Sequence, residues 1–152
     1  MTPSASIGAF IRGYEKCRLR AYMPTANDVP TIGWGSTGSD IHLGMVWTQQ
    51  QADERFSRDL AAFGRGVAGL IGNALTTQGQ YDSMVSLAYN IGIANFAKSS
   101  VLTNHKAGHY STAALAFQLW NKQRDKTTGQ LVVLGGLTKR RAVEAKIYGG
   151  TL

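Results

Sequence analysis

The chain has 152 residues, 43% of them hydrophobic, which is typical of one globular domain and excludes a disordered chain. Sixteen Lys and Arg against nine Asp and Glu give a net charge of +7, which favours an anionic partner such as nucleic acid, a membrane surface or a cell-wall polymer. The single cysteine excludes an intrachain disulfide scaffold. The sequence contains no run of about 18 apolar residues, so we predict no stable membrane insertion.

The first predicted element is a helix over residues 4–15. Apolar side chains recur at helical spacing from Ile7 to Tyr14, and Ser4 or Ser6 can cap its start. The segment lacks a basic stretch followed by a long apolar run, so we expect no signal peptide and a protein made in a cytoplasm.

The next part, residues 19–47, is rich in glycine. Four glycines separate short runs such as PTIGWG at residues 30–35, a pattern typical of strands joined by tight turns. We therefore predict a small β-rich lobe over about residues 16–47.

Two capping boxes then predict helix starts. Thr48 opens TQQQ and Thr77 opens TQGQ, each with glutamine three residues after the threonine. The first helix should run to about Leu70, with its end frayed by three late glycines, and the second should end near Gly92.

Three shorter helices fit residues 99–107, 111–120 and 138–148, and the segment before the last one is predicted to be a loop or hairpin. Strands clustered first and helices after them predict an α+β fold. The helical lobe would cover about residues 70–152, with the first helix packed against it and the long helix from Thr48 joining the two lobes.

Several kinds of site find no support in the sequence. There is no Gly-x-x-x-x-Gly-Lys phosphate loop and no Gly-x-Ser-x-Gly nucleophile motif. His105 and His109 are four residues apart, but no Glu follows His105 and Gly108 weakens the helix, so we interpret them as a solvated pair and predict no metal.

Most carboxylates have a structural explanation at a helix start, in a polar loop or beside basic residues. These are Asp53, Glu54, Asp59, Asp82, Asp125 and Glu144. Glu15, Asp28 and Asp40 remain, all near the predicted β-rich lobe.

Glu15 lies where the first helix should end, next to Tyr14 and not far from Tyr22 in the sequence. The negative end of a helix favours a protonated carboxyl, and the basic residues between 16 and 20 oppose that effect. A proton-holding Glu across a cleft from a second polar group is what glycoside cleavage requires. The alternative is a surface Glu paired with an arginine.

Three blocks resemble the phage-type lysozymes, the endolysins of glycoside hydrolase family 24. They are YEKCRLRAY with PTIGWGSTG (residues 14–38), QYDSMVSLAYNIGIANFAKSSVL (80–102) and GLTKRRAVEAKIY (136–148), in the order of the family. The resemblance implies a lysozyme-like fold with a cleft between the lobes, and one such domain over residues 1–152.

The resemblance also implies an activity. It is hydrolysis of the β-1,4 bond between N-acetylmuramic acid and N-acetylglucosamine in peptidoglycan, for host cell lysis. Peptidoglycan glycan strands are the expected partner, with no nucleic acid, no cofactor and a monomeric enzyme. The expected location is the host bacterial cytoplasm before release, then the periplasm and cell wall.

The catalytic trio of the family is Glu, then Asp or sometimes Cys, then Thr. Glu15 and Thr31 match the first and last members. The middle position falls on Pro24 when counted forward from the tyrosine and on Thr25 when counted back from Thr31, and neither is acidic. Asp28 is the only carboxylate in the loop, so we predict that it replaces the missing acid; the alternative is that it only forms a turn.

The matched blocks also imply substrate-binding residues. The candidates from these blocks are Tyr22, Asn90, Arg140 and Arg141, and Thr25 of the loop between residues 22 and 31 is added to them. Tyr22 could instead only pack, Asn90 could cap its helix, and the two arginines could pair with Glu144.

Three other functions remain open. The loss of the second acid is compatible with a peptidoglycan-binding pseudoenzyme, and a lytic transglycosylase could work with Glu15 alone. A nucleic-acid module is the weakest alternative, because the basic residues are dispersed and no recognition motif is present.

Overall fold

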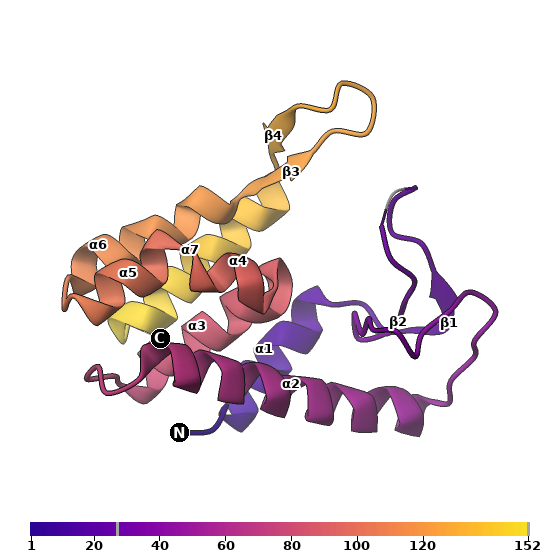
Figure 1. Cartoon of the computed structure of the whole chain (residues 1–152), viewed down its shortest axis with the longest axis horizontal. Helices are drawn as coiled ribbons and strands as arrows, with labels where there is room; N and C mark the ends of the chain where they lie inside the picture. The colour runs from indigo at the N-terminus through magenta and orange to yellow at the C-terminus, as the bar shows by residue number, and fades with distance from the viewer. Residues whose placement is uncertain (27, 152) are drawn as a thin grey trace.

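The computed structural model describes residues 1–26 and 28–151 and confirms the α+β fold (Figure 1). Strands β1 and β2 form one antiparallel pair, and β3 and β4 form another. The elements in chain order are α1 (Ala5–Tyr14), β1 (Arg18–Tyr22), β2 (Thr31–Gly33), α2 (Gln49–Ile71), α3 (Gln78–Ile91), α4 (Ile93–Ala97), α5 (Ser100–Lys106), α6 (Tyr110–Ala116), the 3-10 helix η1 (Phe117–Trp120), β3 (Lys122–Arg124), β4 (Leu131–Val133) and α7 (Gly135–Gly149).

Side-chain caps start the helices at the predicted places. Ser4 and Ser99 each accept the backbone N–H three residues later, which caps α1 and α5. At Thr48 and Thr77 both halves of the capping box form, because the glutamine three residues on also accepts the threonine N–H. These caps satisfy N–H groups that a helix start otherwise leaves unpaired.

Helix α2 does not fray at its late glycines, in contrast to the prediction, but continues to Ile71. A Cβ on Gly64 would lie 2.6 Å from the Tyr81 hydroxyl, and one on Gly66 would lie 3.0 Å from Ile93. The glycines therefore allow α3 and α4 to pack closely on α2, and that packing offsets their low helix propensity.

Three clusters of buried side chains hold the chain together. The largest lies between the end of α2 and the helices from α3 to α7. We call the part of the chain that holds α3 to α7 the helical lobe. A small cluster of Ala21, Ile32 and Ile41 lies under β1 and β2, in the part up to Trp47 that we call the β-lobe. Ile7 and Ile11 of α1 pack on Phe56 of α2 between them.

Helix α2 runs along one side of the molecule from the helical lobe to the β-lobe (Figure 1). Polar bonds fix the β-lobe to it. The Trp34 indole N–H donates to Asp53 over 2.8 Å, and the Ser36 hydroxyl donates to Asp59 over 2.6 Å. The hydrogen bond from Trp34 is the main cause of a lowered pKa of Asp53, and a hydrogen bond from Gln49 adds to it. The position of the β-lobe is therefore set by α2.

Some elements differ from the sequence prediction. Helix α4 was not predicted, and α7 begins at Gly135, three residues before the expected start. The segment before α7 is a hairpin, one of the two predicted alternatives, with Lys122 opposite Val133. In the part of the chain that the structure describes, no helix combines the length and apolar character needed to cross a membrane.

The predicted solvated pair of histidines is wrong for His105. Its ring is buried, with one nitrogen 2.6 Å from the Tyr148 hydroxyl and the other 2.8 Å from the Thr76 hydroxyl. Burial lowers the pKa of His105. It acts as a neutral link in the core of the helical lobe.

Candidate active site

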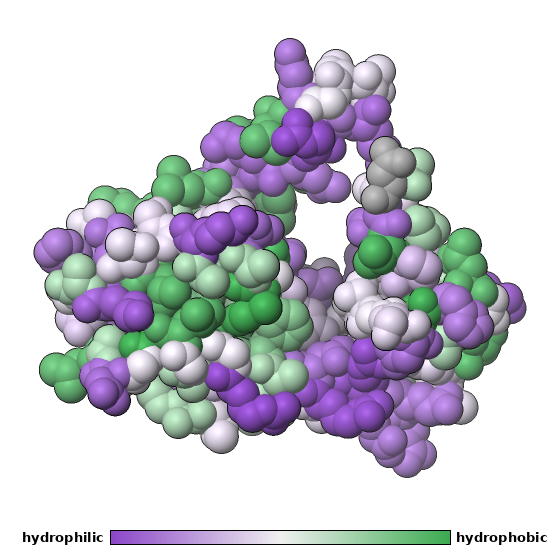
Figure 2. Space-filling model, viewed as in Figure 1, coloured by the Kyte–Doolittle hydropathy of each residue, from purple (hydrophilic) through white to green (hydrophobic). Residues whose placement is uncertain are grey.

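A cleft of about 600 Å³ separates the β-lobe from the helical lobe. Figure 2 shows the molecule hollowed between them. Both lobes line the cleft. The β-lobe side is formed by Tyr22, Pro24, Asp28, Thr31 and Gly35, and the opposite side by the end of α3 and the base of the β3–β4 hairpin, with Glu15 also in the lining. Three predicted catalytic residues, Glu15, Asp28 and Thr31, therefore lie around one cavity.

A larger hollow of about 890 Å³ lies elsewhere, between the starts of α1 and α3 and the end of α7. Asp82, the one carboxylate among its described lining residues, already accepts hydrogen bonds from Ser4 and Gln78. None of the predicted site residues lines it. We therefore place the chemistry in the smaller cleft, where the reactive side chains are.

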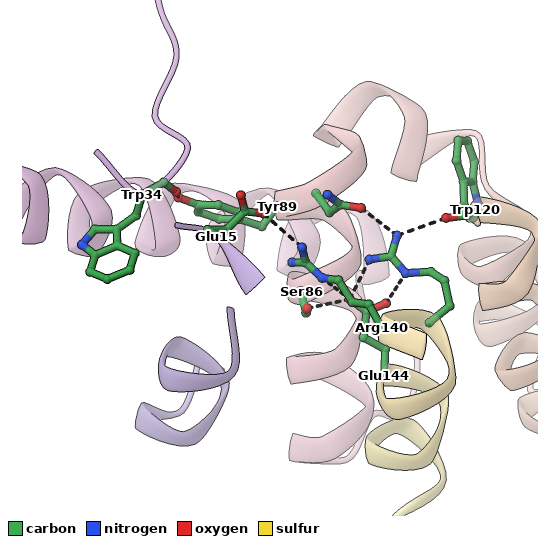
Figure 3. Close-up of polar contacts among 9 residues, drawn as sticks. Glu15, Trp34, Ser86, Tyr89, Trp120, Arg140 and Glu144 are labelled. Atoms are coloured by element: carbon green, nitrogen blue, oxygen red, sulfur yellow. Dashed lines mark hydrogen bonds and ion pairs between the residues drawn. The ribbon is translucent and has the colours of Figure 1, made fainter. Parts of the chain in front are cut away.

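Glu15 directly follows α1, and its N–H donates to the Ile11 carbonyl over 2.9 Å, so its backbone is fixed by the helix end. Its side chain is 22% exposed, and Oε1 lies 3.0 Å from Nη1 of Arg140 (Figure 3). A Cβ on Gly35, whose φ is +87°, would lie 3.1 Å from Glu15 Oε2. The absence of a side chain at Gly35 thus lets the β-lobe backbone approach the carboxylate.

A buried ionic cluster holds Arg140 in place. Glu144 is fully buried and accepts bonds from Ser86 over 2.7 Å, Arg141 Nη2 over 2.9 Å and Arg140 Nε over 3.3 Å (Figure 3). The pKa of Glu144 is raised, because burial outweighs the opposing effects of the two guanidinium groups and the Ser86 hydroxyl. One guanidinium, that of Arg140, therefore joins the buried Glu144 to Glu15 in the cleft.

The structure shows the contacts of the two arginines that were predicted to bind substrate. The side chains of Arg140 and Arg141 are only 4% and 0% exposed, although Arg140 lines a smaller hollow together with Glu15 and Asn90. The alternative, pairing with Glu144, is what the structure has. Arg141 also donates to Asn90 Oδ1 over 2.9 Å, and Asn90 does line the cleft, so Arg141 positions a residue that can meet substrate.

Thr31 and Asp28 lie on the β-lobe wall of the cleft. The Thr31 side chain is mostly buried, and its hydroxyl donates to the Val29 carbonyl over 3.1 Å. Asp28 is exposed, and its Oδ1 accepts the Val29 N–H over 2.8 Å. Asp28 thus makes the backbone contact expected if it only forms a turn. It also lines the cleft, as expected if it replaces the missing acid.

The remaining loop residues divide between wall and turn. Pro24 lines the cleft, whereas Thr25 does not appear among the described lining residues and accepts the Asp28 N–H over 3.2 Å through its carbonyl. Asn27, which the sequence placed at the same turn, lies outside the described residues.

Aromatic residues shape the cleft on both sides. Tyr22 lies in β1, and the guanidinium carbon of Arg18 is 4.3 Å from its ring centroid. Tyr89 was not predicted; its hydroxyl donates to the Trp34 carbonyl over 2.7 Å, joining α3 to the β-lobe (Figure 3). Burial raises the pKa of Tyr89, which therefore keeps its proton at neutral pH. The one sequence signal that could have identified Tyr89 as a site residue is its position next to Asn90 in the second matched block.

Trp120, Lys122 and Gln123 also line the cleft and were not predicted. They belong to η1 and the β3–β4 hairpin, a segment outside the matched blocks. Within residues 1–26 and 28–151, no three His, Cys, Asp or Glu side chains gather as a metal site would need.

Comparison with known proteins points to one family. A family model described as phage lysozyme matches residues 12–144. The chain is 37% identical over 140 residues to an endolysin of Bacillus phage PZA, covering 91% of this chain but 51% of that one, so it spans about half the length of that relative.

Two solved structures are similar over nearly their whole length. An endolysin from Escherichia coli O157:H7 phage FAHEc1 has a TM-score of 0.84 at 35% identity, covering 100% of this chain and 96% of the other. The muramidase domain of SpmX from Asticaccaulis excentricus has a TM-score of 0.83 at 31% identity, covering 95% of each chain.

Proposed function

Because this chain belongs to the phage lysozyme family, we propose that it is an endolysin that hydrolyses the β-1,4 bond between N-acetylmuramic acid and N-acetylglucosamine in bacterial peptidoglycan. The observation that carries the proposal is the Glu15 carboxylate, held by Arg140 at 3.0 Å on the floor of a cleft with Thr31 and Asp28 on its wall. A cleavage site in a glycan needs this arrangement of an acid and a water-binding group.

Glu15 acts as the general acid. Its carboxyl proton passes to the glycosidic oxygen as the bond from that oxygen to the anomeric carbon breaks. Arg140 fixes Oε1, so the proton is carried on Oε2, the oxygen that lies next to Gly35.

Thr31 and Asp28 hold the attacking water. The Thr31 proton is engaged by the Val29 carbonyl, so its oxygen presents lone pairs that can accept a hydrogen bond from water. Asp28 Oδ2 takes the proton that the water loses as its oxygen bonds to the anomeric carbon. Tyr22 and Asn90 contact the sugar chain from the two walls.

The catalytic unit in this proposal is one domain over residues 1–152, with its β-rich lobe at about 16–47 and its helical lobe at about 70–152. It works as a monomer, since all proposed catalytic residues come from one chain. We place it in the host cytoplasm before release and at the cell wall afterwards, where the net charge of +7 favours an anionic polymer.

A digest of purified peptidoglycan tests the proposal. Mass spectrometry should find new reducing muramic acid ends, because water is the acceptor. Anhydro-muramic ends would instead indicate a lytic transglycosylase using Glu15 alone. Binding to the polymer without any cleavage would indicate a pseudoenzyme that has lost its second acid.

A further inference from the structure

The base of the β3–β4 hairpin forms part of the cleft wall that faces the loop of the β-lobe. Lys122 and Gln123 line the cleft together with Pro24 and Asp28 from the opposite side. In Figure 1 the hairpin projects from the helical lobe on the side where that loop lies. A glycan strand in the cleft would therefore pass between the loop and the hairpin.

The charges around the cleft are unevenly placed. Among the described lining residues, Glu15 and Asp28 are acidic and Lys122 is the one cation. The Lys122 ammonium has no carboxylate partner within the described residues; its donor contact is the neutral Asn121 side-chain oxygen at 3.4 Å. Its positive charge is thus available to a ligand, in contrast to that of Arg140, which Glu15 and Glu144 take up.

The backbone next to Lys122 is held in place relative to the catalytic centre. The Leu134 N–H donates to the Asn121 carbonyl over 3.0 Å, which closes the hairpin base, and Asn121 Nδ2 donates to Thr138 of α7 over 3.3 Å. Arg141 donates to the Trp120 carbonyl over 3.4 Å. The hairpin base therefore stands on the same buried cluster that holds Glu15.

We propose that Lys122 binds a free carboxylate of the stem peptide that muramic acid carries. This inference rests on the proposed function. Glu15 and Asp28 repel such a carboxylate, and Lys122 attracts it, so the charge pattern directs the peptide side of the strand toward the hairpin. Lys122 is then a specificity residue that selects peptide-bearing glycan over a neutral one.

The test compares Lys122→Gln and Lys122→Arg with wild type on native peptidoglycan and on the same polymer with its carboxyl groups amidated. Lys126→Gln is the matched control, because it removes the same charge from an exposed position in the loop beyond β3, away from the cleft lining. Lys122→Gln should raise KM on native polymer about fivefold with kcat unchanged, the scale of an exposed ion pair. Lys122→Arg should stay near wild type.

On amidated polymer the difference between Lys122→Gln and wild type should vanish. A third substrate is strands stripped of peptides by an amidase, which removes the peptide carboxylates and leaves the lactyl carboxyl free. On these strands the difference should also vanish, and a difference of the native size would overturn the assignment to the peptide. Equal effects of Lys122→Gln and Lys126→Gln, or an unchanged difference on amidated polymer, would overturn the inference. Wild type inactive on every substrate would instead reject the proposed function itself.

Discussion

Arg140 and Glu15 are separated by 125 positions in the sequence, yet Nη1 of one lies 3.0 Å from Oε1 of the other. The pair connects helix α7, near the C-terminus of the chain, to Glu15, which directly follows α1 near the N-terminus. Because Arg140 also contacts the buried Glu144, the orientation of the proposed acid depends on the core of the helical lobe.

Replacing Gly35 by alanine tests the close approach to Glu15. The new Cβ would meet Glu15 Oε2 at 3.1 Å and push the carboxylate from its position. We expect turnover to fall about tenfold or more, since small displacements of a catalytic group are costly.

Gly44→Ala is the control, because its φ of +97° imposes similar strain with nothing within 4 Å of the Cβ. Both variants should lose about 1–2 kcal/mol of unfolding free energy. Equal turnover in the two variants, measured on purified peptidoglycan, would mean that Gly35 has no specific relation to Glu15.

Glu144→Gln should destabilise the fold strongly. It removes the negative charge that two buried guanidinium groups share, and an uncompensated buried charge costs about 3–5 kcal/mol. Denaturant unfolding should show this loss. Glu54→Gln makes the same chemical change on the exposed face of α2 and should stay within about 0.5 kcal/mol of wild type. Similar unfolding curves for both variants would contradict a stabilising role for the buried cluster.

The parts of the structure that follow local rules could be predicted from the sequence. Thr48 and Thr77 fix helix starts through hydrogen bonds to residues three positions away, so each capping box can be recognised from four consecutive residues. Helix α4 was not predicted, because its five residues are too few to show a helical repeat of apolar side chains. The α2 glycines were misjudged because their partners, Tyr81 and Ile93, come from other helices.

The candidate site shows the same division. Motif matching found Glu15 and Thr31, and the structure places both at the cleft. Motif matching also selected Arg140 and Arg141 as substrate-binding residues, but a motif does not show whether a side chain is buried. In the structure the two arginines donate hydrogen bonds to Glu15, Asn90 and Glu144. Such long-range pairing has no signature within a short stretch of sequence.

Asp28→Asn separates the two roles of the loop carboxylate. If Asp28 is the base, the substitution should lower turnover by about 10²–10⁴, because Asn keeps the turn but cannot take a proton. Thr31→Ala and Thr25→Ala are assayed beside it. Near-wild-type turnover in Asp28→Asn, with a loss in either threonine variant, would assign the water to hydroxyl groups and limit Asp28 to its bond with the Val29 N–H.

Lysis should weaken as salt is added. A protein with a net charge of +7 gains from long-range attraction to an anionic polymer, and salt screens that attraction. The initial rate of turbidity loss of permeabilised cells, followed from low to moderate ionic strength, measures the effect. A flat profile would show that net charge does not contribute to capture of the substrate.

Glu15→Gln tests the central claim most directly. The substitution keeps the shape of the side chain and a hydrogen-bond acceptor for Arg140, but removes the proton that the leaving oxygen needs. We expect turnover on purified peptidoglycan to fall by at least about 100-fold, with an unchanged melting temperature. Turnover within a few-fold of wild type, in a variant that melts as wild type does, would contradict the account.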